Sequence, residues 1–224
     1  MLGLALEGGG AKGAFHMGAV KAFLDEGYVF DGVAGTSIGA LNGAIIAQGD
    51  FDLGYQWWGK MDTSLLFDID QTHIQNFMNK KIDKEVLFYL SSKVKNIVEN
   101  RGLDTKKIRE TLKLIIDEEK LRQSHTDFGI VTVSMSDLKP LELYKEDIPY
   151  GKMIDYLMAS ANFPAFRIEP IEGKFYIDGG FYDNCPINLL SRKGYQEVIT
   201  IRTMGIGRIR KIEDEHENEY KNSA

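Results

Sequence analysis

Short apolar runs alternate with helical periodicities at the start of the chain. Residues 2–6 are apolar and lead directly into a glycine-rich turn, a pattern typical of a buried strand. The apolar positions that follow recur at helical spacing until Gly27, and a second strand is expected within residues 28–34. A second helix, built from small residues, then ends near Gly49. This β-α-β-α order predicts an α/β fold with a mostly parallel central sheet and helices on its faces.

The pattern becomes helical in the middle of the chain. Residues 51–125 predict a helical insertion over the sheet, and two interpretations stay open: an ordinary covering layer, or a cap over an apolar site. From residue 208 the chain is charged and poor in apolar residues. We therefore expect one domain over residues 1–207 and a charged tail over 208–224. The remaining expected elements are strands at 128–135, 141–144, 175–177 and 197–201 and a helix at 152–161.

Composition and charge narrow the class of partner. The 224 residues have the composition of a soluble globular protein, and the net charge of −6 argues against nucleic acid as a partner. The single cysteine, Cys185, excludes an internal disulfide and is interpreted as structural. No apolar stretch reaches the roughly 20 residues of a membrane-spanning helix. We expect a cytoplasmic protein, with peripheral contact at a membrane surface left open.

The turn Gly35-Thr36-Ser37-Ile38-Gly39 has the G-x-S-x-G form of a nucleophile elbow. In such a turn the serine lies on a sharp bend between a strand and a helix, with its Oγ exposed. The flanking glycines, Gly35 and Gly39, allow the strand and helix backbones to come close together. The alternative is a tight turn with an incidental serine. The context of an apolar strand before and a small-residue helix after favours Ser37 as a nucleophile.

A serine hydroxyl needs a base to accept its proton. The favoured candidate is Asp178, which ends a predicted strand and is followed by Gly179 and Gly180. An aspartate with its ordinary pKa of ~3.9 is a weak base, so it needs a desolvated site, a short distance and a well-stabilised oxyanion. An ordinary Asp-Gly turn is the alternative for this segment. A histidine base, with His125 ahead of His16, is the alternative mechanism.

The first glycine-rich turn is the candidate for stabilising that oxyanion. Consecutive glycines let adjacent backbone N–H groups point in one direction, and a following helix adds its positive end. Lys12 is either an added positive charge or a solvated first-turn lysine. The same stretch fits the weak G-x-G-x-x-G fingerprint, so a non-catalytic lipid- or dinucleotide-binding module is the rival function. The candidate oxyanion-hole residues are Gly8, Gly9, Gly10, Ala11, Lys12 and Gly13.

Taken together, these motifs resemble the patatin-like phospholipase family. Residues 8–13 resemble its oxyanion motif, 35–39 its nucleophile elbow and 178–180 its Asp-Gly-Gly motif. Ala159-Ser160-Ala161 with Pro164 resembles the segment that precedes the last of these. The resemblance implies a three-layer α/β/α fold, a Ser–Asp dyad without histidine, hydrolysis of phospholipids or other lipid esters, and no metal or cofactor. The lipid headgroup, acyl position and oligomeric state stay open.

Overall fold

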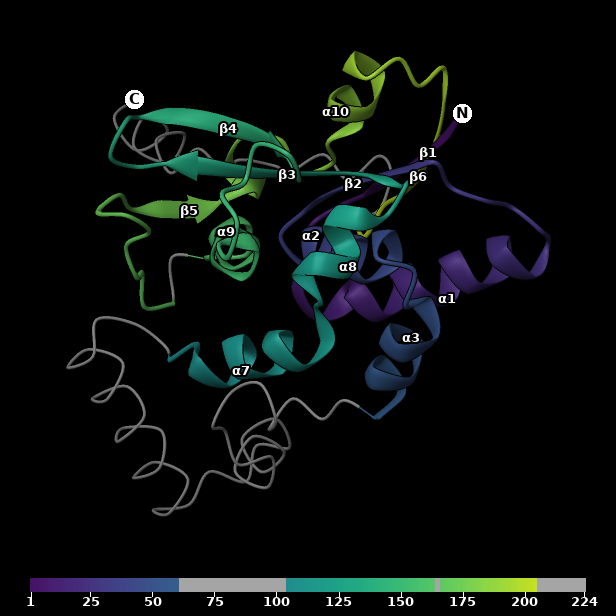
Figure 1. The fold of residues 1–224 in the computed structure, drawn as a ribbon, viewed down its shortest axis with the longest axis horizontal. Coiled ribbons are helices and arrows are strands. Elements are labelled where there is room, and N and C mark those ends of the chain that lie inside the picture. Colours follow the sequence, from purple (N-terminus) through teal and green to yellow (C-terminus); the bar gives the residue numbers. More distant parts are fainter. Residues whose placement is uncertain (61–103, 164–165, 205–224) are drawn as a thin grey trace, which may run out of the picture.

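The computed structural model describes residues 1–60, 104–163 and 166–204, which form a sheet flanked by helices (Figure 1). The strands are β1 (Leu2–Leu6), β2 (Gly32–Thr36), β3 (Asp127–Ser134), β4 (Lys139–Tyr144), β5 (Tyr176–Asp178) and β6 (Glu197–Ile201). The α-helices are α1 (Gly13–Asp25), α2 (Ile38–Ala47), α3 (Phe51–Lys60), α7 (Lys106–Ile115), α8 (Glu118–Gln123), α9 (Met153–Ser160) and α10 (Ile187–Arg192). Two short 3-10 turns are η1 (Gly10–Lys12) and η2 (Gly179–Phe181).

The sheet is mixed, with mostly parallel strands. Its order is β4-β3-β2-β1-β6, in which β1, β2, β3 and β6 are parallel and β4 is antiparallel to β3. A sixth strand, β5, also pairs with β3 in the antiparallel sense. The expected three-layer α/β/α architecture is confirmed.

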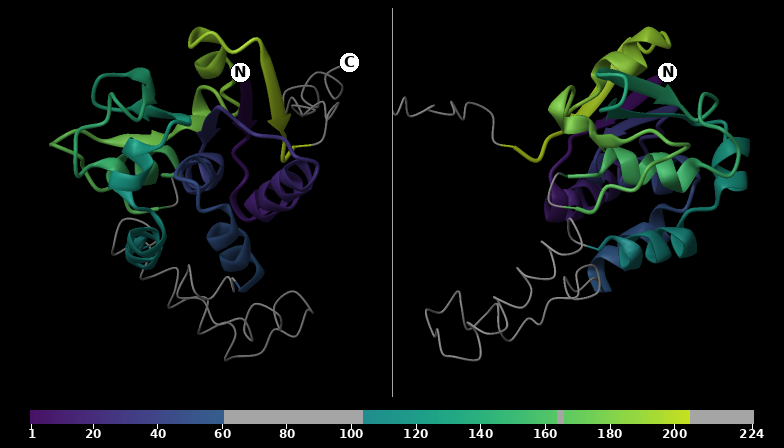
Figure 2. Two further views of the ribbon diagram at one scale, coloured as in Figure 1. Left: turned by 45° about the vertical axis from the view of Figure 1, so that its right-hand side comes forward. Right: turned by 90° about the vertical axis from the view of Figure 1, so that its left-hand side faces the viewer.

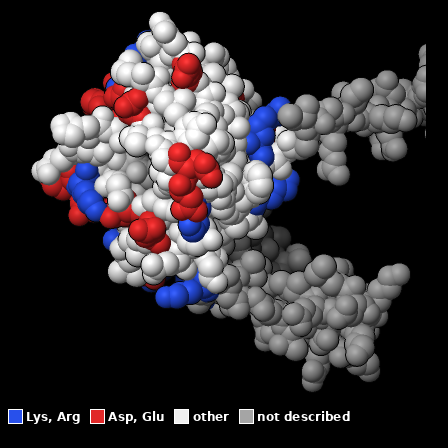
Figure 3. Space-filling view, turned by 90° about the vertical axis from the view of Figure 1, so that its right-hand side faces the viewer, with Lys and Arg blue, Asp and Glu red and all other residues white. Residues whose placement is uncertain are grey.

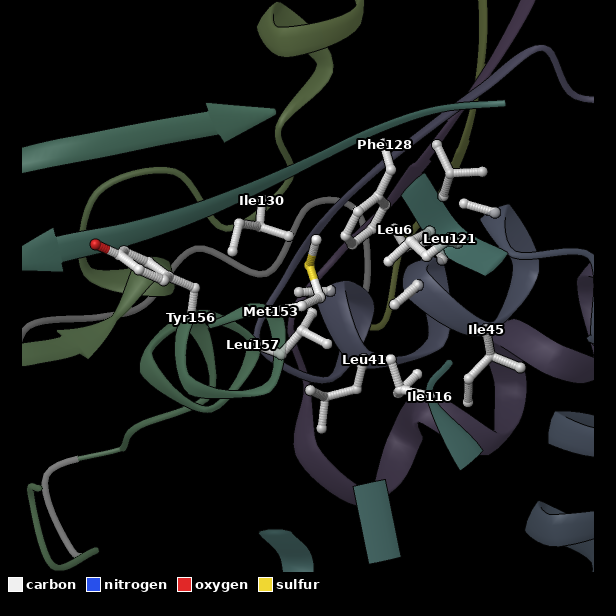
Figure 4. Packing of buried hydrophobic residues seen from close by; sticks show 14 of the residues in the cluster. Leu6, Leu41, Ile45, Ile116, Leu121, Phe128, Ile130, Met153, Tyr156 and Leu157 are labelled. Atoms are coloured by element: carbon white, nitrogen blue, oxygen red, sulfur yellow. The ribbon is translucent and has the colours of Figure 1, made fainter. Parts of the chain in front are cut away.

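Helices cover the two faces of the sheet unequally. In Figure 4, Phe128 and Ile130 of β3 face Leu41 of α2 and Met153 and Leu157 of α9, and all five side chains belong to the larger core. On the opposite face, α10 covers a smaller core, and because neighbouring residues of a strand point to opposite faces, one strand serves both cores. The buried members of the smaller core are Ala5, Ala34, Val131, Leu189, Leu190 and Tyr195.

Most strand and helix predictions agree with the structure to within two residues, and the start of the second strand is wrong. β1 and β6 have the predicted bounds, and Gly27 and Gly49 follow α1 and α2 with φ angles of 83° and 86°. The second strand was expected within residues 28–34 but begins only at Gly32. Residues 28–30 form a loop before it, and Asp31 joins that loop to β1: its carboxylate accepts the Leu2 N–H at 2.7 Å and its own N–H donates to the Leu2 carbonyl at 2.9 Å.

Three of the described helices, α3, α7 and α8, fall within the predicted helical insertion. Residues 61–103 of that insertion, and residues 205–224 with the predicted charged tail, lie outside the described residues.

No helix in the described part of the chain is both long and apolar enough to cross a membrane. Figure 3 shows one face of the molecule, where acidic side chains form separate groups among wide uncharged areas.

Backbone contacts bring β1, β2 and α2 together where the strands end. A Cβ atom on Gly35 would lie 2.2 Å from the carbonyl oxygen of Gly39. A Cβ on Gly39 would lie 2.2 Å from the carbonyl oxygen of Leu6. Backbone atoms cannot move aside as the end of a flexible side chain can, so both positions require glycine. This close packing fixes the start of α2 against the end of β1.

We expect Gly39→Ala to destabilise the protein by about 3 kcal/mol or more, because the new methyl group overlaps the backbone of β1. The matched control is Gly18→Ala. Gly18 lies within α1 and a Cβ there meets no atom within 4 Å. Alanine at this helical position should raise stability by about 0.5–1 kcal/mol. Urea unfolding of both variants measures the difference, and equal stabilities would contradict the packing argument.

Candidate active site

Ser37 occupies a strained backbone position between β2 and α2. Its φ and ψ angles are 56° and −126°, a conformation that costs a non-glycine residue about 1–3 kcal/mol. Three hydrogen bonds hold this bend. The Ser37 N–H donates to Oγ of Ser160 at 3.0 Å, and the Ser37 carbonyl accepts the N–H groups of Ala40 at 2.9 Å and Leu41 at 3.2 Å. Ser160 is completely buried. The bend therefore has the form that the G-x-S-x-G pattern predicts.

The strand register brings Asp178 to Ser37. β4 occupies one edge of β3 over Gly129–Ser134, so β2 and β5 must share the other edge. On that edge Thr36 is opposite Val131, and Asp178 is opposite the next residue, Thr132. β5 thus approaches the end of β2 from the opposite direction. Ser37, which follows Thr36, meets Asp178 where the two strands converge.

The two side chains are in hydrogen-bond contact. Ser37 Oγ donates to Asp178 Oδ2 at 2.6 Å, and the Gly180 N–H donates to Asp178 Oδ1 at 2.8 Å. Asp178 is only 7% exposed. Burial raises the pKa of its carboxyl group above the ordinary value, although the hydrogen bonds from Ser37 and Gly180 act in the opposite direction. The site thus holds a serine hydroxyl against a carboxylate that is a stronger base than an exposed one.

Gly179 contributes through close packing, as the elbow glycines do. A Cβ there would lie 2.2 Å from the carbonyl oxygen of Val131. The turn after β5 therefore rests directly on the backbone of β3. This contact fixes the position from which Gly180 donates to the Asp178 carboxylate.

The first glycine-rich turn lies beside Ser37. A Cβ on Gly8 would be 3.2 Å from Ser37 Cβ, and Gly10 has a φ of 59°. The Gly8 N–H donates to the carbonyl oxygen of Asn184 at 2.9 Å, so this amide is already engaged. Within the described residues, the N–H groups of Gly9 and Gly10 have no hydrogen-bond partner. These two amides remain as candidate donors to an oxyanion.

The last three residues of the turn connect it to its surroundings. Ala11 continues η1, and the Lys12 ammonium group donates to the Thr203 carbonyl at 3.3 Å. A Cβ on Gly13 would lie 2.4 Å from the Ile38 side chain, so α1 begins in close contact with α2. Lys12 therefore ties the turn to the end of β6 while its side chain stays exposed.

Glu7 is a site residue that the sequence patterns did not single out. This carboxylate is 1% exposed and accepts the N–H groups of Thr203 at 2.6 Å and Met204 at 2.9 Å. Burial alone would raise its pKa, but these hydrogen bonds and the Arg202 guanidinium together lower it below the ordinary value. An acidic residue between a buried strand and a glycine turn is the signal that could have found it.

Neither described histidine contacts Ser37. His16 is buried in α1, where its Nδ1 lies 3.4 Å from the Asn42 amide nitrogen, and burial lowers its pKa to about 4 despite the opposing influence of Glu7. His125 is exposed in the loop before β3, at the end of that strand away from Asp178. The other two histidines, at 73 and 216, lie outside the described residues.

Two further features bear on the chemistry. Burial, followed by the negative charges of Glu7 and Asp183, raises the pKa of Cys185 to about 11. Such a thiol is protonated at neutral pH and is a poor nucleophile, which fits a structural role. In the described ranges no three His, Cys, Asp or Glu side chains gather into a group that could hold a metal ion.

Known proteins resemble this chain over most of its length. The family model for patatin-like phospholipases matches residues 4–191. A patatin-like phospholipase domain-containing protein of Caenorhabditis elegans, ZK370.4, is 27% identical over 88% of this chain and 13% of its own. Lysophospholipase NTE1 of Mycosarcoma maydis is also 27% identical, over 89% of this chain and 9% of its own. This chain therefore spans only about a tenth of the length of these relatives.

A solved structure shares the fold. The crystal structure of VipD from Legionella pneumophila superposes with a TM-score of 0.55 and 17% identity, covering 88% of this chain and 49% of that one. At this identity the similarity speaks for the fold. The family model, in contrast, covers the elbow, the glycine-rich turn and the Asp178 turn together. The chain belongs to the patatin-like phospholipase family, a family of lipid-ester hydrolases.

Proposed function

We propose that this protein hydrolyses acyl esters of phospholipids or other lipids, with Ser37 as the nucleophile and Asp178 as the proton acceptor. The observation that carries the proposal is the 2.6 Å hydrogen bond between Ser37 Oγ and Asp178 Oδ2, which joins residues 141 positions apart. Family membership and the name of the lysophospholipase relative support a lipid ester as the substrate. A binding module needs no strained serine held against a buried carboxylate.

The reaction follows from the positions of these atoms. Ser37 Oγ attacks the ester carbonyl while its proton passes to Asp178 Oδ2, and the carbonyl oxygen becomes an oxyanion. The N–H groups of Gly9 and Gly10 stabilise that charge. The intermediate collapses by breaking the bond to the alcohol, which takes the proton from Asp178. Water then attacks the acyl-enzyme and gives a proton to Asp178. The bond between the acyl carbon and Ser37 Oγ breaks, Oγ takes the proton back from Asp178, and the fatty acid is released.

The surroundings of Asp178 make a carboxylate adequate as a base. Burial raises its pKa, and a stronger base is a better proton acceptor. Oδ1 is occupied by the Gly180 N–H, so Oδ2 is the oxygen that faces Ser37. The Ser37 backbone is held in turn by Ser160 and the first turn of α2. Little reorganisation is then needed when the proton moves.

Exposed aromatic side chains adjacent to the site support contact with a lipid surface. Phe181 and Tyr182 directly follow Gly180. Phe163 follows Asn162, whose carbonyl accepts the Asp178 N–H. Phe15 lies in the first turn of α1. Their exposed fractions, in this order, are 60%, 57%, 55% and 60%. The right-hand view of Figure 2 shows the purple start of α1 and the yellow end of the described chain on one side of the molecule. Aromatic rings favour the interfacial region of a bilayer.

Ser37→Ala and Asp178→Asn are each expected to reduce turnover of a p-nitrophenyl ester by at least about 1,000-fold, because one removes the nucleophile and the other the proton acceptor. Circular dichroism and thermal melting establish that both variants fold. A fluorophosphonate should add one mass increment to the wild-type protein at Ser37 and none to Ser37→Ala. Near-normal turnover by Asp178→Asn would refute the dyad. Absence of labelling, together with thermal stabilisation by a dinucleotide, would favour the rival binding function.

The pH dependence of kcat/KM should report the ionisation of Asp178 in the free enzyme. Its folded pKa is raised above 3.8, so the carboxylate is lost as the pH falls through that raised value. Activity should therefore decline on the acid side at a pH above 3.8. Initial rates on a soluble ester across the stability range of the protein measure this, and a decline only at or below 3.8 would contradict the assignment.

Phe181→Ala should weaken binding to phosphatidylcholine vesicles about tenfold, since a buried phenylalanine contributes about 1.5–3 kcal/mol. Hydrolysis of vesicle lipid should fall in parallel, while turnover of a soluble short-chain ester stays near the wild-type rate. The matched control is Tyr150→Ala. Tyr150 is 74% exposed and lies beside α8, where its hydroxyl donates to Glu119. Equal vesicle binding by both variants would place the lipid contact elsewhere.

A further inference from the structure

We propose that Thr203 and Asn184 are positioning residues that aim the N–H of Gly9 at the oxyanion. This inference rests on the function proposed above, in which that N–H is a donor. It concerns how a segment without side chains acquires a defined orientation. The peptide unit between Gly8 and Gly9 is planar, and its two edges have different neighbours.

One edge of this peptide unit is held by hydrogen bonds. The Gly8 carbonyl oxygen accepts the Thr203 hydroxyl at 2.6 Å and the Asn184 side-chain amide at 3.3 Å. Because the peptide unit is trans, the Cα of Gly9 lies on the same edge as that oxygen. A Cβ on Gly9 would be only 2.3 Å from Thr203 Oγ1. Thr203 therefore packs along the whole edge that contains the Gly8 oxygen and the Gly9 Cα.

The other edge faces the nucleophile. A trans peptide unit is planar, with the N–H on the side opposite the carbonyl oxygen and on the same side as the preceding Cα. The described chain contains no cis peptide bond, so the Gly9 N–H lies on the edge that contains the Gly8 Cα. That edge borders both Asn184 and Ser37, since a Cβ on Gly8 would be 2.3 Å from Asn184 Oδ1 and 3.2 Å from Ser37 Cβ. Holding the carbonyl in place thus directs the N–H towards the reaction site.

Thr203 and Asn184 are themselves held in place. The buried Glu7 carboxylate accepts the Thr203 N–H at 2.6 Å, and the Thr203 carbonyl accepts the Lys12 ammonium group at 3.3 Å. The Asn184 backbone carbonyl accepts the Gly8 N–H at 2.9 Å. Both residues therefore contact the glycine-rich turn through backbone and side chain. A hydrogen bond to a buried, charged carboxylate is stronger than one between neutral groups, which makes Glu7 an effective anchor.

The decisive comparison is Thr203→Val against Thr203→Ser. Valine keeps the shape but removes the hydroxyl, so the peptide unit loses its main restraint. We expect kcat on a p-nitrophenyl ester to fall about 10- to 100-fold with KM changed less than about twofold, because the donor acts on the transition state. The rate of fluorophosphonate labelling at Ser37 should fall in parallel, since the phosphonyl oxygen occupies the same position. Serine restores the hydroxyl and should restore both rates.

A second variant and a control separate positioning from stability. Asn184→Asp replaces the amide donor by an acceptor of similar size and should also lower kcat. It provides the test if Thr203→Val does not fold. Tyr144→Phe removes a hydroxyl that donates to the Leu189 carbonyl at 2.7 Å, and Tyr144 is opposite Gly129, whereas Asp178 is opposite Thr132 of the same strand. It should lower the melting temperature without lowering kcat.

The possible results separate the positioning role of Thr203 and Asn184 from the proposed ester hydrolysis on which it rests. If the wild-type protein hydrolyses esters and Thr203→Val does so with the same kcat, the positioning role is refuted and the dyad stands. If Thr203→Val lowers only the melting temperature, as the control does, the hydroxyl is structural and the inference is again refuted. A wild-type protein that neither hydrolyses esters nor is labelled at Ser37 would refute the proposed function and this inference together.

Discussion

The site depends on the hydrogen-bonding edge of β3 that β2 and β5 share. A strand has two edges, and β4 takes the whole of one. On the other, β2 ends opposite Val131 and the antiparallel β5 ends opposite Thr132, so the two strands meet end to end. The residues that follow or terminate them, Ser37 and Asp178, are thereby placed within hydrogen-bond distance by backbone pairing. The side chains themselves need little freedom to find each other.

Around this junction the chain packs backbone against backbone. Gly35, Gly39 and Gly179 each leave no room for a Cβ because a main-chain oxygen lies where it would be. Gly10 is different, since a Cβ there meets nothing within 4 Å and only its φ of 59° favours glycine. These four glycines thus serve two physical purposes, close approach to a main-chain oxygen at Gly35, Gly39 and Gly179 and backbone conformation at Gly10. Their pattern looks uniform in the sequence although the constraints differ.

Local patterns predicted most of the fold and the main contacts of the site. The apolar runs at residues 2–6 and 197–201 predicted the bounds of β1 and β6, and Gly27 and Gly49 indicated where α1 and α2 end. The start of the second strand was wrong because apolar residues before Gly32 belong to a loop fixed by a distant contact to Leu2. The G-x-S-x-G and Asp-Gly-Gly patterns predicted Ser37 and Asp178 as site residues, and the two side chains are hydrogen-bonded in the structure.

What the sequence did not reveal is the set of residues that act across long separations. Thr203 binds the Gly8 carbonyl over 195 positions, Asn184 over 176, and Ser160 reaches Ser37 over 123. No periodicity or motif encodes such pairs, because each depends on which strands become neighbours. Nor did the sequence reveal that the Gly8 amide donates to the carbonyl oxygen of Asn184.

The absence of side chains in the glycine-rich turn has a consequence for how this protein can vary. Gly8, Gly9 and Gly10 have no side chain, and replacing any of them changes the main chain. Under the proposed function, smaller changes in the rate of ester hydrolysis therefore come from residues outside these three. The Gly8 carbonyl is contacted by Asn184 and Thr203, which lie 176 and 195 positions later in the sequence. Under the function proposed above, Asn184 and Thr203 are therefore positions at which directed evolution could change the orientation of the Gly9 amide without altering the turn itself.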